Sequence, residues 1–389
     1  MNMLQWQDIS FNMAFFGNPN SFLGIDIGTS SLKLVELVGR KRRIELTAYA
    51  QAALENPLDD EGVKTEEVIT RAAGVIRTMM DKAGTSSDQA VVALPASAVF
   101  TSVLEMPPMP EAEMQKAVEF AARDVVPAEL EDIVLGYSRL GEKPHLAIKS
   151  KGAEVTPAPN VPTLVTPSDT TVPVFITAAP KYLVERYIAL LDRLEMKLVA
   201  LELETFPLVR SLLPSETASA MAVDIGDRAT TYHIIDRGTP RVSYTAEYGG
   251  FTITEQIAAA SSISFEEAEK LKAQHGLLDS ASPVQKEAAL KVVTTQAGKA
   301  KEVLDRYHQQ GGRQITSTVL IGGGANLPGL VDVWQSVVGH KVSVGNPWRG
   351  LSYPQQLESR LQYLGPAYGV AVGLALRNFM GVADGNKEI

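Results

Sequence analysis

The sequence feature that most constrains the fold is an internal repeat. Residues 22–50 and residues 221–248 follow the same plan. In each copy an apolar strand ends in Asp-Ile-Gly, an alternating strand returns from the turn, and a third strand follows a polar turn. Two such meanders, far apart in the chain, predict two similar α/β lobes that arose by duplication, each with a mixed sheet and covering helices.

Helical periodicity identifies three of the covering helices. Apolar side chains lie on one face of residues 183–194 and on one face of residues 114–125. A third helix is predicted over 265–273, because Ser264 followed by Glu267 forms a capping box. Burial in a core is enough to explain these apolar faces.

Composition limits the classes of function. The 389 residues are 45% hydrophobic, which suits a globular protein of two or more lobes. The net charge of -9 leaves no broad basic surface, so nucleic acid is not expected as a partner. The chain has no cysteine, which excludes disulfides, thiolate metal sites and a cysteine nucleophile.

No apolar run approaches the roughly 20 residues that a membrane-spanning helix requires. Residues 1–21 form an N-terminal extension without the basic and apolar regions of a signal peptide, so a cytoplasmic protein is expected. Trp6, Ile9, Met13 and Phe16 lie near one helical face of this extension. A surface anchor and a frayed or self-packed extension therefore both stay open.

Residues 98–178 depart from the duplicated plan and predict an inserted small α+β subdomain. Strands are expected near 100–105, 133–140 and 172–177. Residues 150–173 are rich in Pro, Thr and Ser and poor in large apolar side chains, which predicts a flexible loop.

The first Asp-Ile-Gly turn is a candidate phosphate site. A buried strand brings Asp26 to a glycine turn whose backbone amides can face an anion. Asp26 would repel phosphate, so its expected role is to bind Mg²⁺ through water. The same pattern also suits an ordinary hairpin turn. The candidate phosphate ligands are Gly28, Thr29, Ser30, Ser31 and Lys33.

The second copy offers a carboxylate, Asp224, with Gly226, Thr230 and Thr231 as phosphate ligands. If the lobes are related by a pseudo-twofold axis, the two turns face each other across one cleft. They would then supply a phosphate clamp from both sides and two carboxylates for one metal ion.

A third candidate segment, 319–330, runs from a buried strand into glycines and then a helix. It has neither the Walker nor the Rossmann spacing. Backbone without side chains lets a flat ring or sugar come close, although a structural glycine turn has the same appearance. The candidate residues are Gly322, Gly323, Gly324 and Asn326.

In this order, the three segments resemble the phosphate 1, phosphate 2 and adenosine motifs of the superfamily of actin, hexokinase and heat-shock chaperones. Segments 93–95, 106–110, 249–254 and 268–272 resemble more narrowly the type IV pilus assembly family PilM and its cell-division relative FtsA. The resemblance covers most of residues 22–377. It implies an actin-like, ribonuclease H-like fold of two lobes, each a βββαβα unit.

The resemblance also assigns roles to residues. It implies ATP or ADP as ligand with Mg²⁺ at Asp26 and Asp224, and adenosine beside Gly322–Gly324. Glu204 corresponds to a water-orienting residue of actin-like ATPases, although a solvated acid at a helix start has the same pattern. Glu269 and Lys272 resemble the pair of residues that contacts the ribose in this superfamily, although a Glu and a Lys three positions apart are otherwise typical of an exposed helix face. The further residues on the nucleoside side are Gly249, Gly250, Glu269 and Lys272.

The domain organisation implied by the resemblance is discontinuous. The first lobe takes residues 22–97, 179–212 and 364–380, the insertion at 98–178 binds partners, and the second lobe takes 213–363. The family role implied is an ATP-binding cytoplasmic component of the inner-membrane platform of a type IV pilus or type II secretion system. The implied partner is the N-terminal cytoplasmic tail of PilN, which holds the protein at the inner membrane. Other platform proteins, the assembly ATPase and a second copy of the chain are further candidates.

Nucleotide is expected to act mainly as a conformational ligand, with slow or absent hydrolysis, because Glu204 is the one candidate for placing water. Two alternatives stay open. A filament-forming FtsA-like membrane scaffold would need an anchor that residues 378–389 do not offer. A small-molecule kinase would need a general-base aspartate in a substrate pocket, which the first lobe does not reveal.

Overall fold

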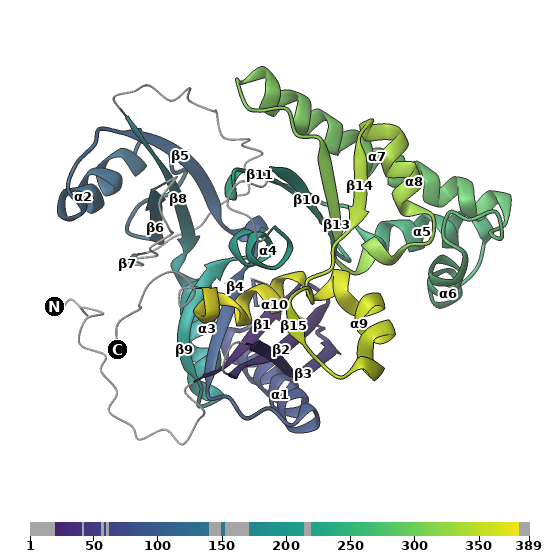
Figure 1. Cartoon of the computed structure of the whole chain (residues 1–389), viewed down its shortest axis with the longest axis horizontal. Helices are drawn as coiled ribbons and strands as arrows, with labels where there is room; N and C mark the ends of the chain where they lie inside the picture. Colours follow the sequence, from purple (N-terminus) through teal and green to yellow (C-terminus); the bar gives the residue numbers. More distant parts are fainter. Residues whose placement is uncertain are drawn as a thin grey trace.

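The computed structural model describes residues 20–40, 43–55, 58–59, 62–139, 149–151, 171–213 and 219–380. The extension 1–21, apart from its last two residues, and residues 152–170 of the predicted loop lie outside this range. The described residues form three sheets with packed helices (Figure 1). None of the helices described is both long and apolar enough to cross a membrane.

The first sheet has the strand order β15-β3-β2-β1-β4-β9. Its core is the predicted meander, in which β1, β2 and β3 pair antiparallel, and β4 and β9 extend it in parallel. In β2, Leu32 and Leu34 are buried on one face of the sheet and Val35 and Leu37 on the other, so both faces are covered. The strands are β1 (Ser21–Ile27), β2 (Ser31–Arg40), β3 (Arg43–Ala53), β4 (Gln89–Leu94), β9 (Lys197–Leu203) and β15 (Leu351–Ser352).

Helices cover the two faces of this sheet with separate clusters of apolar side chains. On one face α1 (Thr65–Ala83) and α3 (Lys181–Arg193) pack on Leu23 and Ile25 of β1. On the other face α4 (Thr205–Leu212) and α10 (Gly369–Ala375) pack on Val91 and Ala93 of β4. The stripe predicted at 183–194 is therefore a core face of α3.

The second sheet, β12-β11-β10-β13-β14, repeats the order β3-β2-β1-β4-β9 of the first. The same alternation of antiparallel and parallel pairs recurs, so the predicted duplication is present in the fold. The strands are β10 (Ala220–Ile225), β11 (Thr230–Asp236), β12 (Thr239–Ala246), β13 (Ser317–Ile321) and β14 (Lys341–Val344). The helices are α5 (Gly250–Ser261), α6 (Phe265–His275), α7 (Pro283–Gln309) and α8 (Leu330–Val338).

Details of the two meanders also match. The first turn closes with Gly28 N donating to Ser31 O at 3.0 Å, and the second with Gly226 N donating to Ala229 O at 2.9 Å. In both, the register shifts by a bulge at equivalent places, after Glu36 and after Ile234. The predicted cap of α6 is also present, since Ser264 Oγ accepts from Glu267 N at 3.2 Å.

The inserted subdomain has its own sheet, β5-β8-β6-β7, and its own core beneath helix α2. The three predicted strands are present. A fourth, β7, and the start of β8 fall at the two ends of the segment predicted as a loop. The elements are β5 (Phe100–Met106), α2 (Glu111–Ala122), β6 (Ile133–Arg139), β7 (Lys149–Lys151) and β8 (Val172–Pro180).

One predicted boundary differs from the structure. The second lobe was predicted to extend to residue 363, but the chain returns to the first sheet before that. Strand β15 pairs in parallel with β3, and Leu361 of α9 (Glu358–Leu364) packs with Val35 and Leu37 of β2. A strand of two residues has no periodicity that a sequence pattern could reveal.

Helices α4 and α10 cross in direct backbone contact. A Cβ atom on Gly373 of α10 would overlap the carbonyl oxygen of Pro207 in α4, and one on Gly24 of β1 would overlap that of Ala371. Helix α4 also contacts β12 of the second lobe. The remaining elements are η2 (Ala96–Ala98), η3 (Gly323–Asn326), η4 (Gln355–Leu357), η5 (Gly365–Tyr368) and α11 (Arg377–Met380).

Candidate functional site

A cleft lies where the first turns of the two meanders meet. It encloses about 750 Å³ of empty space, including space open to solvent, and both turns contribute to its wall. Ten residues predicted for the site line it together: Asp26, Gly28, Thr29, Ser30, Ser31, Lys33, Glu204, Asp224, Gly226 and Thr231. Segments about 200 residues apart in the chain thus lie on opposite sides of one space.

The first turn places a carboxylate and a cation next to each other. Asp26 on β1 is paired with Lys33 on β2, so both side chains point to the same face. Lys33 Nζ lies 3.5 Å from Asp26 Oδ2 and donates to Ser31 Oγ at 3.1 Å. Burial raises the pKa of Asp26, and the charge of Lys33 opposes that shift. This side of the cleft can therefore meet both a cation and an anion.

The second turn has the carboxylate without the cation. Asp224 on β10 is paired with Thr231 on β11, the position equivalent to Lys33. Burial and the negative charge of Asp26 raise the pKa of Asp224 to about 6, and the positive charge of Lys33 opposes the shift. The two aspartates therefore interact electrostatically across the cleft.

Glu204 enters the cleft from the start of α4. Its backbone N–H donates to Leu94 O at 3.1 Å, which fixes the end of β9 beside the end of β4. Burial and the negative charge of Asp224 raise the pKa of Glu204 to about 8, and a hydrogen bond from the backbone of Ala96 opposes the shift. The carboxyl group is thus held by the backbone of Ala96.

The donor set suits a magnesium ion that keeps most of its water. Mg²⁺ prefers oxygen ligands and is usually held by one or two carboxylates together with phosphate oxygens and water. Asp26 and Asp224 are two such carboxylates, and within the described ranges no group of three or more His, Asp or Glu side chains could enclose a metal ion. Gly322 has a φ of +82°, and a Cβ there would overlap Asp224 Oδ1. The glycine therefore leaves room for this carboxylate.

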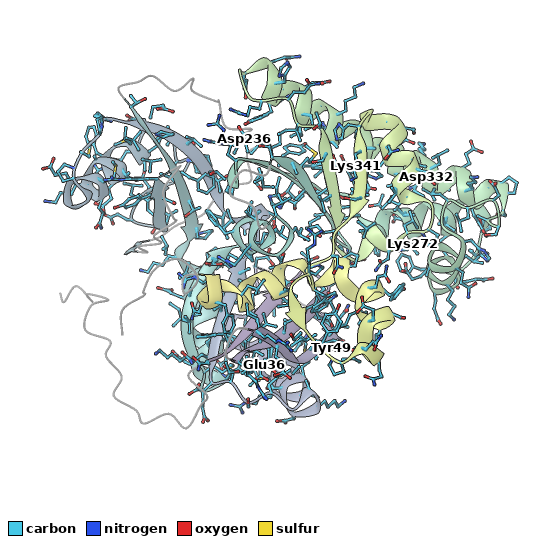
Figure 2. All side chains as sticks on the ribbon, viewed as in Figure 1. Glu36, Tyr49, Asp236, Lys272, Asp332 and Lys341 are labelled. Carbon is cyan, nitrogen blue, oxygen red and sulfur yellow. The ribbon has the colours of Figure 1, made fainter. Side chains whose placement is uncertain are left out.

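A second group of predicted residues lies behind the second turn and consists of Gly249, Gly250, Glu269 and Lys272. Gly250 N donates to Gly226 O at 2.9 Å, which joins the start of α5 to the turn. Lys272 Nζ donates to Gly250 O at 3.1 Å and lies 2.7 Å from Glu269 Oε2. Figure 2 shows Lys272 on this α5 and α6 side of the second lobe. The adjacent Gly249 has no room for a side chain, since a Cβ would overlap the carbonyl oxygen of Asp227.

The glycine segment after β13 connects the two lobes. Gly322 N donates to Pro366 O at 2.8 Å, and Gly324 packs against Ile225 so closely that a Cβ would overlap it. Gly323 is exposed, and nothing would lie within 4 Å of a Cβ there. Asn326 ends the short helix η3. This segment gives the bare backbone surface that the sequence predicts, although these residues do not line the cleft between the turns.

Thr230 is the predicted phosphate ligand that points elsewhere. It is fully buried, its Oγ1 donates to Tyr248 O at 2.7 Å, and it accepts from Gln296 Nε2 at 3.2 Å. The alternation of a strand explains the difference, because neighbouring side chains face opposite sides of the sheet. Thr231 faces the cleft, so Thr230 faces the core.

Among the residues that line the cleft, Asp59, Ser97 and Thr245 carry polar side chains and were not predicted as site residues. Thr245 could have been found, since it is paired with Thr231 in the register of β11 and β12. Asp59 follows the first meander in a segment without periodicity, and its charge contributes to the raised pKa of Glu204.

Comparison with known proteins places these features in a family. The model of the family "Type IV pilus assembly protein PilM" matches residues 24–151 and 161–379. The chain belongs to the PilM family. A solved PilM-PilN type IV pilus biogenesis complex superimposes with a TM-score of 0.74 at 25% identity, over 91% of this chain and 97% of that one.

More distant relatives agree with the fold of the PilM family. The ethanolamine utilization protein EutJ from Carboxydothermus hydrogenoformans superimposes with a TM-score of 0.54 at 17% identity, over 92% of this chain and 90% of that one. The cell division protein FtsA from Agrobacterium fabrum is 26% identical over 179 residues, which are 40% of this chain. The chain spans only 39% of the length of the curated FtsA relatives. The fold is the two-lobed fold of the actin-like ATPases.

Proposed function

We propose that this member of the PilM family binds ATP or ADP with Mg²⁺ between its lobes and uses the nucleotide to control partner binding. The observation that carries the proposal is that both Asp-Ile-Gly turns line one cleft. Asp26 and Asp224 would hold Mg²⁺ through water, and the ion would neutralise phosphate charge. The phosphates would lie against the turn residues, and the nucleoside against Gly322–Gly324, with Glu269 and Lys272 beside the ribose.

Turnover in this site is proposed to be slow or absent. Hydrolysis needs a group that orients water in line with the terminal phosphate. The proposed residue, Glu204, is already engaged by the backbone of Ala96. A nucleotide that stays bound acts as a conformational ligand, because it stabilises the lobe arrangement that it contacts on both sides.

The proposed partner is the N-terminal cytoplasmic tail of PilN, by analogy with the PilM-PilN complex that this chain resembles. The inserted subdomain would present the binding surface, which the cleft can influence through α4. The first residue of α4 follows Glu204, and Phe206 in α4 packs edge-on against Phe175 of β8 with ring centroids 5.7 Å apart. A shift of α4 on closure would therefore move β8. This partner would hold the protein at the cytoplasmic face of the inner membrane.

Calorimetric titration with Mg·ATP tests the nucleotide site. We expect binding by the parent chain and a loss of at least 100-fold in affinity for Asp26→Ala. Asp332→Ala is a matched control, because Asp332 lies on α8 in the second lobe and not in the wall of the cleft (Figure 2). Equal affinity in the parent and Asp26→Ala would refute the site.

A second titration with a synthetic PilN tail peptide tests the coupling. The peptide should bind with different affinities in the presence and absence of Mg·ATP, and Phe206→Ala should reduce this difference while nucleotide still binds. Identical peptide affinities with and without nucleotide would show that nucleotide binding and partner binding are not coupled.

A further inference from the structure

Strand β3 has a free edge. On one side β3 pairs with β2 along its whole length. On the other side β15 pairs with it only at Ile44 and Glu45, and no other described strand continues this ladder along residues 47–53. An unpaired edge presents backbone donors and acceptors that another extended chain can use.

The hydrogen-bond pattern shows which residues of β3 point outward. Leu54 N donates to Ser30 O at 2.9 Å, so Leu54 and Ser30 form a hydrogen-bonded pair at the end of the ladder between β2 and β3. In an antiparallel ladder such pairs alternate with pairs that do not bond each other. The backbone groups of Tyr49, Gln51 and Ala53 therefore point away from β2, toward the free edge.

A continuous groove follows this edge. Three hollows with empty volumes of about 610, 750 and 960 Å³ adjoin along it and share lining residues. Two of them share Gln51 and Lys82, and two share Tyr49 and Arg360. Helix α1 borders the groove on one face of the sheet and α9 on the other, with Tyr49 on the α9 side (Figure 2). The unpaired stretch of β3 beside the groove, residues 47–53, is about 24 Å long.

The groove is positively charged in a negatively charged protein. Its lining includes Arg71, Lys82 and Arg360 and no Asp or Glu. Arg71 forms ion pairs with Glu55 and Glu67, which lie outside these three hollows. Lys82 and Arg360 are exposed and form no ion pair within the part of the chain that the structure describes. The Lys82 charge is thus available to an incoming chain, and Arg360 lies beside the edge with its guanidinium carbon 6.0 Å from the centroid of the Tyr49 ring.

We propose that this edge binds an extended acidic segment of a partner protein, which pairs as a strand with Tyr49, Gln51 and Ala53. Main-chain hydrogen bonds would supply affinity, and Lys82 and Arg360 would select acidic side chains. A second copy of the chain is disfavoured as the occupant, because it would bring the same cations to the same edge. Residues 1–19 contain one acidic residue, Asp8, and do not match the charge.

This surface is separate from the nucleotide cleft and from the inserted subdomain. In the strand order β15-β3-β2-β1-β4-β9, the free edge is at one end of the sheet. The inserted subdomain follows β4 and returns to β9 through β8 and α3, at the opposite end. The edge could therefore be occupied while a nucleotide and a tail peptide are bound.

Two substitutions can disturb the groove without disturbing the fold. Gly74 on α1 is exposed in the groove wall, and a Cβ there would meet nothing within 4 Å. Gly74→Gln should fill the groove, and it replaces a glycine inside a helix, which favours the helix by up to about 1 kcal/mol. Gln51→Pro removes one outward N–H and leaves the ladder to β2 intact, a position where strands tolerate proline.

Fluorescence anisotropy with defined probes tests the proposal. The first probe is a capped eight-residue peptide that alternates valine and glutamate. The second replaces each glutamate with lysine, and the third carries a central proline, which prevents strand pairing. We expect the glutamate peptide to bind full-length protein at least 10-fold more tightly than either of the others. Hydrogen exchange should slow at the amides of Tyr49, Gln51 and Ala53 when it is bound.

The variants separate this edge from a general charge effect. Lys82→Glu with Arg360→Glu, Gln51→Pro and Gly74→Gln should each weaken the glutamate peptide at least 10-fold, whereas Mg·ATP affinity should not change. Lys291→Glu with Lys301→Glu, two exposed lysines of α7, is the charge-matched control and should change affinity less than 2-fold. The proposal is overturned if the glutamate peptide does not bind, if the lysine peptide binds equally well, or if protection falls outside β3.

Discussion

The two meanders share a backbone plan but not a set of side chains. Both close their first turn with the same hydrogen bond, both place an aspartate at the end of the first strand, and both contain a bulge at the equivalent place. Among the equivalent positions that differ on the second strand are Lys33 and Thr231, Val35 and His233, and Glu36 and Ile234. Duplication thus preserved the geometry of the cleft, whereas charge was distributed unevenly between its two sides.

The different side chains of the two meanders indicate different roles for the two lobes. The first lobe holds the cation beside its aspartate, so it is expected to carry most of the electrostatic attraction for phosphate. The second lobe has a hydroxyl at that position and a buried histidine two residues later, at the contact with α4. Four predictions test this division, from the largest expected effect to the smallest.

The largest effect is expected at the bulge of the first meander. Glu36 is 2% exposed, and its Oε1 accepts from Ser86 N at 2.7 Å and from Ser87 N at 2.8 Å. Its Oε2 accepts from Thr47 Oγ1 at 2.6 Å. Glu36→Ala leaves these buried donors without an acceptor, so the free energy of unfolding should fall by about 3–5 kcal/mol.

Chemical denaturation followed by tryptophan fluorescence measures this loss. The equivalent change in the second meander, Ile234→Val, removes one methylene and should cost about 1 kcal/mol. If Glu36→Ala lowered the free energy of unfolding no more than Ile234→Val does, the hydrogen bonds of Glu36 would not stabilise the first bulge.

The next effect concerns the unequal charge. Lys33→Ala should lower Mg·ATP affinity about 100-fold, because a charge-assisted contact near phosphate contributes about 2–3 kcal/mol. Lys33→Arg should retain part of that affinity, since it keeps the charge. Calorimetry on variants with parental circular dichroism measures the effect. A loss below 3-fold would show that the first lobe does not carry the attraction.

A smaller effect is expected from His233, whose counterpart Val35 cannot titrate. His233 is fully buried, its Nδ1 lies 3.2 Å from Thr205 Oγ1 and 3.1 Å from Ser243 Oγ, and its Nε2 has no hydrogen-bond partner in the described structure. Burial lowers the pKa of His233 to about 3, well below 6.5 for the unfolded chain. The unfolded state therefore binds the proton more readily, and acid favours unfolding.

Stability should be unaffected by His233 above pH 6.5 and should fall as the pH drops below that value. Between pH 7 and pH 5 the expected loss is about 2 kcal/mol. Denaturation of the parent and His233→Asn at both pH values isolates this contribution, because the other titrating groups are common to both. An equal pH dependence in the two proteins would contradict the assignment.

The smallest effect distinguishes two neighbouring threonines. Thr231→Val should lower nucleotide affinity less than 10-fold and leave stability unchanged, because Thr231 lines the cleft. Thr230→Val should do the reverse and cost about 1–2 kcal/mol of stability, because two buried hydrogen bonds are lost. Paired titrations and melting curves would reveal any exchange of these roles.

Much of the fold could be predicted because its elements follow from local sequence patterns. The two meanders and the core faces of the helices depend on periodicities of two and 3.6 residues, and the cap of α6 depends on Ser264 and Glu267. The pairing of β15 with β3 could not be predicted, since it joins two residues to a strand about 300 positions away. The strand β7 is only three residues long, so it could not be predicted from periodicity either.

The candidate site was predictable for a different reason. Its main residues repeat at equivalent places, so the duplication pointed to Asp26 and Asp224 together. Asp59 and Ser97 could not be found in this way, because each occurs once, in a segment without periodicity. Thr230 could have been separated from Thr231 by the alternation of the strand, had the register of β10 and β11 been known.

The backbone contact between α4 and α10 has a mechanical consequence. Because Pro207 and Gly373 touch without side chains between them, neither helix can slide along the other without steric overlap. Both helices also pack on β4 of the first sheet, so we expect them to move with the first lobe as one rigid unit when the width of the cleft changes. A residue larger than glycine at position 373 would push α4 away from α10 and displace Glu204 at the start of α4, although it replaces no residue of the cleft wall.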